Sequence, residues 1–387
     1  MPLPERSAAQ PQRIYVVAGM HRAGTSVMAR ALQALGIDLG PCLMSADVRM
    51  NARGFFEDLD LVGIDDDLLA ACAADWKSVA VLDEVDWDAP AFSAPAALAR
   101  AFMAARVSPT GAFGCKDPRI PRLLPFWQRQ FATMGLSDHY IVAIRHPRSV
   151  VDSLTARDGL DPRRSAWLWL IHLACALYYA AGRPLVVVDY DQMLAAPRRE
   201  LTRIRSALSI PLVAALDVDA ALSLFVDDFL TSGLRHAKHA GTEFADAPFH
   251  ALVSEAWALA SALARDELTP AVARAPIAAL FARIREMSPL LAYAGAVERV
   301  ADDVPRLEGE LQWARASLSA AVEHASSLAA VLDERDRAQA AAAEFAIDLS
   351  STLQRKDAEL AEVHRLLEHL QQRVLGRALL RAAAKKA

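Results

Sequence analysis

A glycine-containing turn near the start of the chain carries residues suited to holding an anionic group. The turn, GMHRAGTS at residues 19–26, follows the apolar run 14–18 and precedes a helical pattern. Glycines let the backbone curl around an anion, while the first amides and the dipole of a helix favour negative charge. The sequence therefore predicts a phosphate-binding turn. Its candidate ligand-binding residues are Gly19, Arg22, Ala23, Gly24, Thr25 and Ser26.

The position of the cation in this turn limits the chemistry. In the nucleotide-triphosphatase pattern G-x-x-x-x-G-K-[ST], a lysine after the last glycine reaches the β- and γ-phosphates. Here that position is Thr25, and the cation lies earlier, at Arg22. This difference disfavours ATP hydrolysis and ordinary kinase chemistry. It suits a ligand whose transferred group sits beside a single 5'-phosphate.

The turn resembles the 5'-phosphosulfate loop of the sulfotransferase family, whose usual form is Arg/Lys-Ser/Gly-Gly-Thr. This chain has Arg22-Ala23-Gly24-Thr25, so only Ala23 departs from the pattern. The resemblance implies that the co-substrate is 3'-phosphoadenosine 5'-phosphosulfate (PAPS). It also implies that no metal is needed, because PAPS has no polyphosphate to bridge. The resemblance extends over roughly residues 12 to 240.

A second element matches the part of the family that binds the 3'-phosphate. The apolar run 140–144 ends in Arg145-His146-Pro147, and Ser153 follows in a helical pattern. Arginine at the C-terminal end of a strand can bind phosphate oxygens with two N–H groups, and a serine hydroxyl adds another bond. Open α/β sheets bind their ligands at this edge. We therefore expect Arg145 and Ser153 to bind the co-substrate.

A third element is Lys116-Asp117-Pro118, after the apolar run 112–115. It resembles a motif of bacterial carbohydrate sulfotransferases and tyrosylprotein sulfotransferases, which implies that Lys116 faces the transferring sulfuryl group. No histidine follows it to act as a base, as one does in the cytosolic small-molecule enzymes. The alternative is a salt bridge between Lys116 and Asp117 at the sheet edge.

A fourth element, NARGFFED at residues 51–58, resembles the Asn-x-x-Gly-aromatic-aromatic-Glu segment of bacterial sulfotransferases. Glu57 is the candidate general base, because two neighbouring phenylalanines would desolvate its carboxylate and raise its proton affinity. The alternative is that Glu57 and Asp58 cap a helix beginning near Leu59. Arg235 is a further candidate that could close over the nucleotide, or it could be a solvated charge.

These residues predict transfer of a sulfuryl group from PAPS to an acceptor hydroxyl, on a carbohydrate or glycolipid by family resemblance. Arg22 would neutralise the leaving 5'-phosphate, Lys116 would assist, and Glu57 would accept the proton. One alternative is a kinase or related phosphotransferase with a degenerate P-loop, in which Ser26 is the magnesium ligand. Another is a non-catalytic coiled-coil scaffold that carries an inactive transferase fold.

The elements that must position these residues read as an α/β fold. The runs 14–18, 112–115, 140–144 and 185–188 are apolar on successive residues, which is typical of strands covered on both faces of a parallel sheet. Helical patterns occupy 26–35 and 148–156, and mostly helical sequence runs from about 195 to 296, with breaks at Pro211, Pro248, Pro270 and Pro276. The pattern predicts an α/β domain with a central parallel sheet at 12–296, and the resemblance implies that it is a sulfotransferase domain with a P-loop-like three-layer fold.

After Pro305 the pattern changes to a heptad repeat. Apolar or small residues recur from Leu307 to Val374 at alternating steps of four and three, with a weak centre between 335 and 346. We predict one long coiled-coil helix at 304–376, through which the chain forms a homo-oligomer. An amphipathic helix lying on the globular domain is the alternative. A basic tail at 377–387 could contact an anionic membrane or be a solvated helix end.

Composition excludes several classes of protein. The chain has 387 residues, a net charge of −5 and 54% hydrophobic residues, so it should fold around a core and not bind nucleic acid. Its 4 cysteines have no spacing that suits a disulfide framework or a zinc site. The apolar stretch 165–181 is short for a bilayer span and is interrupted by His172. We read this stretch as a buried helix, with a membrane span as the alternative, and expect a cytoplasmic protein that could contact a membrane peripherally.

Overall fold

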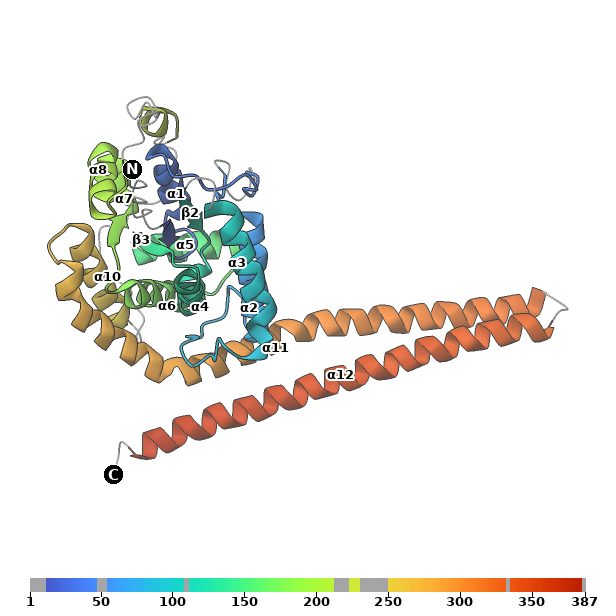
Figure 1. Ribbon diagram of the computed structural model, residues 1–387. Helices are drawn as coiled ribbons and strands as arrows, with labels where there is room; N and C mark the ends of the chain where they lie inside the picture. The colour runs from blue at the N-terminus through green and yellow to red at the C-terminus, as the bar shows by residue number, and fades with distance from the viewer. Residues whose placement is uncertain are drawn as a thin grey trace. The chain divides into compact units, whose positions relative to one another are not determined.

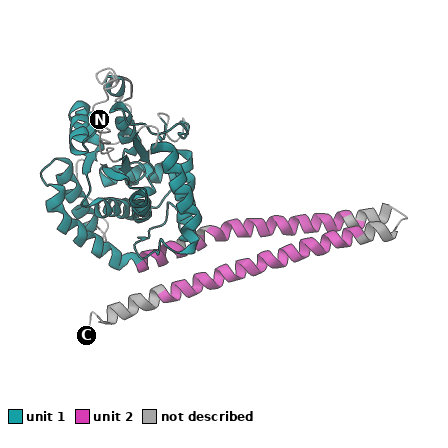
Figure 2. Cartoon of the chain, viewed as in Figure 1, with its two compact units in different colours: residues 1–288 teal, residues 289–387 magenta. Residues whose placement is uncertain are grey.

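The computed structural model describes residues 12–46, 54–107, 111–211, 223–229, 250–331 and 335–384. The chain divides into two compact units, unit 1 (residues 1–288) and unit 2 (residues 289–387), which are coloured separately in Figure 2. The change from one unit to the next falls inside a long helix.

Unit 1 is built on a four-stranded parallel sheet in the order β2-β1-β3-β4 (Figure 1). All four predicted strands are confirmed, and each is buried along most of its length. The continuous apolar runs fit this position, because a strand with helices on both faces has no solvent side. The strands are β1 (Arg13–Ala18), β2 (Ala112–Lys116), β3 (Ser137–Ile144) and β4 (Leu185–Asp189).

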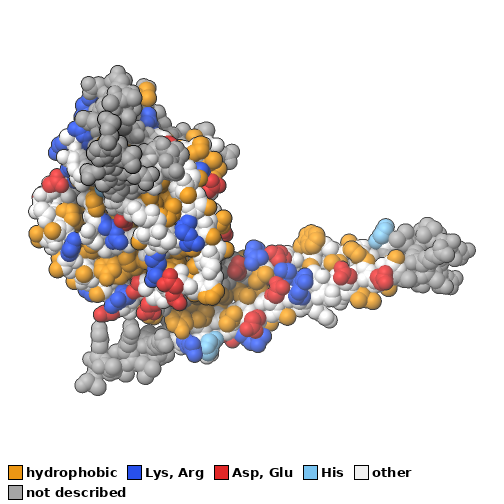
Figure 3. Space-filling view, viewed as in Figure 1, with side chains coloured by type: hydrophobic (Ala, Val, Ile, Leu, Met, Phe, Trp, Pro, Cys, Tyr) orange, Lys and Arg blue, Asp and Glu red, His pale blue; other side chains and the backbone are white. Residues whose placement is uncertain are grey.

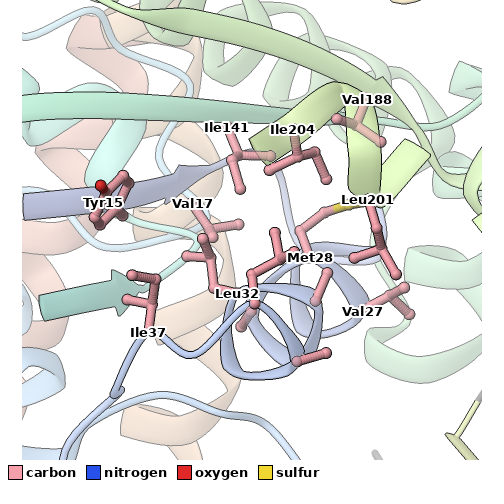
Figure 4. Close-up of a cluster of buried hydrophobic side chains, with 14 of the residues drawn as sticks. Tyr15, Val17, Val27, Met28, Leu32, Ile37, Ile141, Val188, Leu201 and Ile204 are labelled. Carbon is pink, nitrogen blue, oxygen red and sulfur yellow. The ribbon is translucent and has the colours of Figure 1, made fainter. Parts of the chain in front are cut away.

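One face of the sheet is covered by α1 (Thr25–Ala34) and α8 (Pro197–Ala207), with the short α7 (Tyr190–Ala195) beside them. Figure 4 shows Val17 and Ile141 of the sheet meeting side chains from both longer helices. This cluster anchors α1, so the turn that precedes α1 is held against the sheet edge. The cluster residues labelled from the helices are Val27, Met28, Leu32, Leu201 and Ile204.

The opposite face carries α4 (Ile120–Thr133) and α6 (Pro162–Ala180), which pack on each other and on β3, while α5 (Pro147–Asp158) packs on α6. The Gln128 amide donates a hydrogen bond to the hydroxyl of Tyr140, 3.0 Å away, which joins α4 to β3. The apolar stretch around His172 is thus a buried core helix. Among the described helices, none is long and apolar enough to cross a membrane.

The remaining elements of unit 1 are α2 (Leu59–Ala71), η1 (Pro90–Phe92), α3 (Ser93–Val107), η2 (Leu224–Phe229) and α10 (His250–Ala264). The predicted start of α2 at Leu59 is confirmed. The predicted break at Pro276 is wrong, because α11 begins at Pro270 and continues through Pro276. The predicted break at Pro248 lies outside the described residues.

The heptad repeat forms two helices instead of one. α11 (Pro270–Val331) ends before the weak centre of the repeat, and α12 (Arg335–Ala384) is the long C-terminal helix. The two run antiparallel as a hairpin (Figure 1). Leu311 and Ala314 of α11 form a small core with Leu353 of α12. The predicted unbroken helix is therefore wrong, because the apolar seam folds back on itself and is buried within one chain.

Candidate functional site

The four predicted motifs of unit 1 follow the C-terminal ends of parallel strands or lie against them. β1 runs into the glycine turn, β2 ends at Lys116, β3 is followed by Arg145, and β4 by Tyr190. Because parallel strands end at one edge of the sheet, these residues gather there from positions spread between 19 and 190 of the sequence.

The glycine turn has little room for side chains. Gly24 has a φ of 88°, and a Cβ added to it would lie 2.4 Å from Cδ2 of Tyr190. A Cβ on Gly19 would lie 2.7 Å from the carbonyl oxygen of Ala143 on β3. Gly19 is thus required by the close approach of β3, and Gly24 by the close approach of Tyr190 at the start of α7. α1 then begins at Thr25, so the turn leads directly into a helix N-terminus, as predicted.

The two predicted phosphate-binding elements are in direct contact. Nε of Arg22 donates a hydrogen bond to Oγ of Ser153 on α5, at 2.8 Å. Arg145 reaches the same turn from β3, because its Nη1 lies 3.4 Å from the carbonyl oxygen of Arg22. The Arg145 guanidinium carbon also lies 4.7 Å from the ring centroid of Tyr190. Residues 22, 145 and 153 therefore form one cluster, which the sequence alone did not establish.

Cations lie close together in this cluster. Burial lowers the pKa of Arg22, and the nearby guanidinium groups of Arg157 and Arg145 lower the pKa further. Nε of Arg145 is buried with no hydrogen-bond partner among the described residues. Cations brought together in this way repel each other unless an anion lies between them. The arrangement can hold a phosphate group.

Lys116 and Glu57 form a buried ion pair. The Lys116 side chain is 2% exposed and that of Glu57 is 7% exposed. Nζ of Lys116 also donates to the carbonyl oxygen of Phe55 at 3.0 Å, and the same oxygen accepts from the Ser26 hydroxyl at 3.2 Å. The third and fourth motifs therefore meet each other and the start of α1. The predicted alternative salt bridge between Lys116 and Asp117 is wrong, because Asp117 pairs with Arg119 at 3.1 Å.

The carboxylates of Glu57 and Asp58 have separate roles. Burial raises the pKa of Glu57, and Asp117 adds to the rise, while Lys116 opposes it. Asp58 is the residue that caps α2, since its carboxylate accepts a hydrogen bond from the backbone N–H of Asp60 at 3.0 Å. Glu57 points instead to Lys116. A desolvated carboxylate of raised pKa can accept a proton from a substrate hydroxyl.

Several predicted features lie outside the described residues. They are Asn51, Ala52 and Arg53 of the fourth motif, Arg235, and the side chains of the basic tail at 377–387. Within the described ranges, no group of three or more histidine, cysteine or acidic side chains could hold a metal ion.

The sequence reasoning missed two residues next to this cluster, Arg157 and Trp76. Arg157 lies one helical turn after Ser153 on α5, and this i, i+4 spacing was the available signal. Trp76 had no signal in the sequence, because it belongs to an irregular segment after α2. Its indole ring lies 4.7 Å, between ring centroids, from the imidazole of His21 in the glycine turn.

A cavity of about 1090 Å³ lies elsewhere in unit 1, between α8 and the end of α10. It is rich in arginine, but these cations already have partners in the protein. Arg203 pairs with Glu200 and Asp266, and Arg265 pairs with Glu267. None of the residues predicted from the sequence lines this cavity, and we place the functional site at the sheet edge.

Comparison with known proteins adds no assignment. No protein family model matches the chain, and no curated protein matches its sequence.

Proposed function

We propose that the chain is a PAPS-dependent sulfotransferase with a P-loop-like α/β fold. The observation that carries the proposal is the hydrogen bond from Arg22 to Ser153. These residues come from the two elements that the family resemblance assigns to opposite ends of one nucleotide. Arg145 contacts the same turn, so two arginines lie together where both phosphates would bind.

The reaction is direct transfer of a sulfuryl group. The acceptor oxygen forms a bond to sulfur as the bond between sulfur and the 5'-phosphate oxygen breaks, and the electron pair leaves with the phosphate. Arg22 stabilises the charge that grows on that phosphate, together with the amides at the start of α1. Lys116 lies beside the start of α1, since both Lys116 and Ser26 donate a hydrogen bond to the carbonyl oxygen of Phe55. From this position Lys116 stabilises the transferring group. Glu57 accepts the acceptor's proton.

The acceptor is a hydroxyl of a carbohydrate or glycolipid, and the protein acts in the cytoplasm, with peripheral membrane contact through the basic tail.

Self-association would involve unit 2. Large apolar side chains remain exposed on this hairpin, including Trp313, Phe345 and Ile347. Figure 3 shows hydrophobic and charged side chains intermingled along it. Light scattering after size exclusion tests this part of the proposal, because a monomer at micromolar concentration would contradict it.

Ligand binding tests the proposed function directly. Adenosine 3',5'-bisphosphate should raise the melting temperature of the full chain without magnesium, whereas ATP with magnesium should not. Stabilisation by magnesium-ATP alone would instead indicate a phosphotransferase.

Arg22→Ala should remove the bisphosphate shift and lower the transfer of labelled sulfate from PAPS about 100-fold or more. The matched control is Arg129→Ala, which removes an exposed arginine of α4 that forms an ion pair with an exposed Asp88. The control should behave as the wild type. If Arg22→Ala retains the shift and the rate, Arg22 has no part in the site.

A further inference from the structure

The segment that follows α2 places an aromatic side chain beside the glycine turn. Trp76 is half-buried, and its ring contacts that of His21 at 4.7 Å with an interplanar angle of 53°. His21 directly precedes Arg22. Trp76 therefore lies next to the turn proposed to bind the 5'-phosphosulfate, although the two are more than 50 residues apart in sequence.

The backbone of this segment is held by a buried cation. Arg122 of α4 is fully buried, and it donates hydrogen bonds of 2.6 Å to the carbonyl oxygens of Asp75 and Ser78. Arg164 of α6 donates to the carbonyl oxygen of Lys77 at 3.0 Å. A buried arginine is costly, and burial lowers the pKa of Arg122 to about 10. Trp76 and Lys77 thus lie on a segment that is fixed in advance, as a binding surface requires.

Two cations flank the tryptophan ring. Nζ of Lys77 lies 5.5 Å from the Trp76 ring centroid, and the guanidinium carbon of Arg157 lies 5.9 Å from it. Arg157 pairs with Asp158 at 2.7 Å. Across the parts of the chain that the structure describes, no carboxylate lies within ion-pair distance of Lys77. The surroundings of Trp76 therefore combine an aromatic ring with two cations, although the Asp75 carboxylate also lies on this segment, where it accepts a hydrogen bond from the backbone N–H of Lys77 at 2.9 Å.

Trp76 and its two flanking cations lie close to the proposed reacting centre. Arg157 and Ser153 are one turn apart on α5, and Ser153 binds Arg22. Burial lowers the pKa of His21 well below its usual value, and the positive charges of Arg119 and Arg157 lower this pKa further. His21 is thus a neutral ring that extends the aromatic surface. A ligand seated on Trp76 would reach toward Arg22.

We propose that Trp76, His21, Lys77 and Arg157 form the subsite for the acceptor, and that the acceptor is a sugar carrying a negative group such as a carboxylate. This inference rests on the proposed sulfotransferase function. The C–H face of a sugar ring packs against an aromatic ring, whose face is electron-rich. Lys77 and Arg157 bind the negative group, and a neighbouring hydroxyl is presented to the sulfuryl group.

The test measures binding, so it needs no turnover. The full chain is saturated with adenosine 3',5'-bisphosphate and titrated calorimetrically with a hexasaccharide of alternating glucuronic acid and N-acetylglucosamine. The same hexasaccharide after carboxyl reduction provides a neutral ligand of equal size. We expect the acidic form to bind at least about 10-fold more tightly than the neutral form. The neutral form lacks the ion pair with the protein, and a tenfold change in affinity corresponds to roughly 1.4 kcal/mol.

Three variants assign the effect to the cluster. Trp76→Ala should weaken binding of both hexasaccharides about 10-fold, whereas Lys77→Gln should weaken only the acidic one and leave the fold intact. Trp313→Ala removes an exposed tryptophan from unit 2 and is the matched control, which should bind as the wild type does. All variants should retain the bisphosphate-induced rise in melting temperature.

The outcomes separate this inference from the proposed function. If the bisphosphate does not stabilise the wild-type chain, the sulfotransferase proposal fails first. If it does stabilise the chain, but the two hexasaccharides bind equally or neither binds, the acceptor class is wrong. If Lys77→Gln and Trp76→Ala both bind as the wild type does, the acceptor does not lie on this cluster.

Discussion

Two ion pairs, one from each unit, lie in opposite environments. The pair of Lys116 and Glu57 in unit 1 has side chains only 2% and 7% exposed, at an edge where strands converge. In unit 2, Arg315 of α11 pairs with Asp357 of α12 at 2.9 Å, with side chains 58% and 49% exposed. A buried charge loses its hydration, whereas an exposed pair keeps most of it.

The difference in exposure suggests different purposes for the two pairs. Burying a lysine and a glutamate together is rarely the cheapest way to stabilise a fold, since apolar residues often do as well. Such a pair at the end of β2 is therefore explained better by chemistry than by stability. In the hairpin, the apolar contacts of Leu311 and Leu353 hold the helices together, and the exposed charges contribute mainly to their alignment.

The largest effect should come from breaking the buried pair. Lys116→Met leaves the Glu57 carboxylate buried without its cation, so the free energy of unfolding of unit 1 should fall by about 3–5 kcal/mol. Urea unfolding followed by tryptophan fluorescence measures it. The double variant Lys116→Met with Glu57→Leu should recover most of the loss while remaining inactive. If the double variant is no more stable than the single one, the pair is not the source of the loss.

A smaller change in stability should come from substituting Asp65, which is also buried in unit 1. Burial raises the pKa of Asp65 well above its usual value, and the neighbouring Asp117 raises it further. A carboxyl whose pKa is raised on folding contributes stability below its unfolded pKa, near 3.9, and this stability is lost as the pH rises through the folded pKa. Asp65→Asn should therefore stabilise the protein at pH 7, by about 1.4 kcal/mol per unit of pKa rise.

The expected gain depends on a preserved hydrogen bond. Nε1 of Trp127 donates to Oδ1 of Asp65 at 2.8 Å, and an asparagine oxygen can accept the same bond. Urea unfolding at pH 7 and pH 4 should show the stabilisation at pH 7 and little difference at pH 4. Equal stability of Asp65→Asn and the wild type at both pH values would mean that the carboxylate has no energetic cost.

The smallest effect should come from the hairpin. Arg315→Ala should lower the stability of unit 2 by only about 0.2–1 kcal/mol, and the loss should shrink further in 1 M salt. Helix melting followed by circular dichroism measures this change. A loss as large as that of Lys116→Met would show that exposed and buried pairs do not differ in this protein.

The sequence predicted the strands of unit 1 well because their signal is local. Each strand is a short apolar run, and Gly24 marked the turn before α1. The repeat in the C-terminal region also predicted that this region is helical. It did not predict that α11 and α12 are separate helices packed against each other, because a heptad seam is equally satisfied by another chain or by its own continuation. The weak centre that begins at Arg335 was the only sign.

The sequence by itself determined which residue types stand at the ends of the strands, and hence where the groups that we propose to bind phosphate would gather. Only the tertiary structure decided their partners. Lys116 pairs with Glu57 and not with its neighbour Asp117, and Trp76 lies against His21. Local patterns reflect backbone preferences over a few residues, whereas these contacts join segments more than 50 residues apart and exist only once the core has packed.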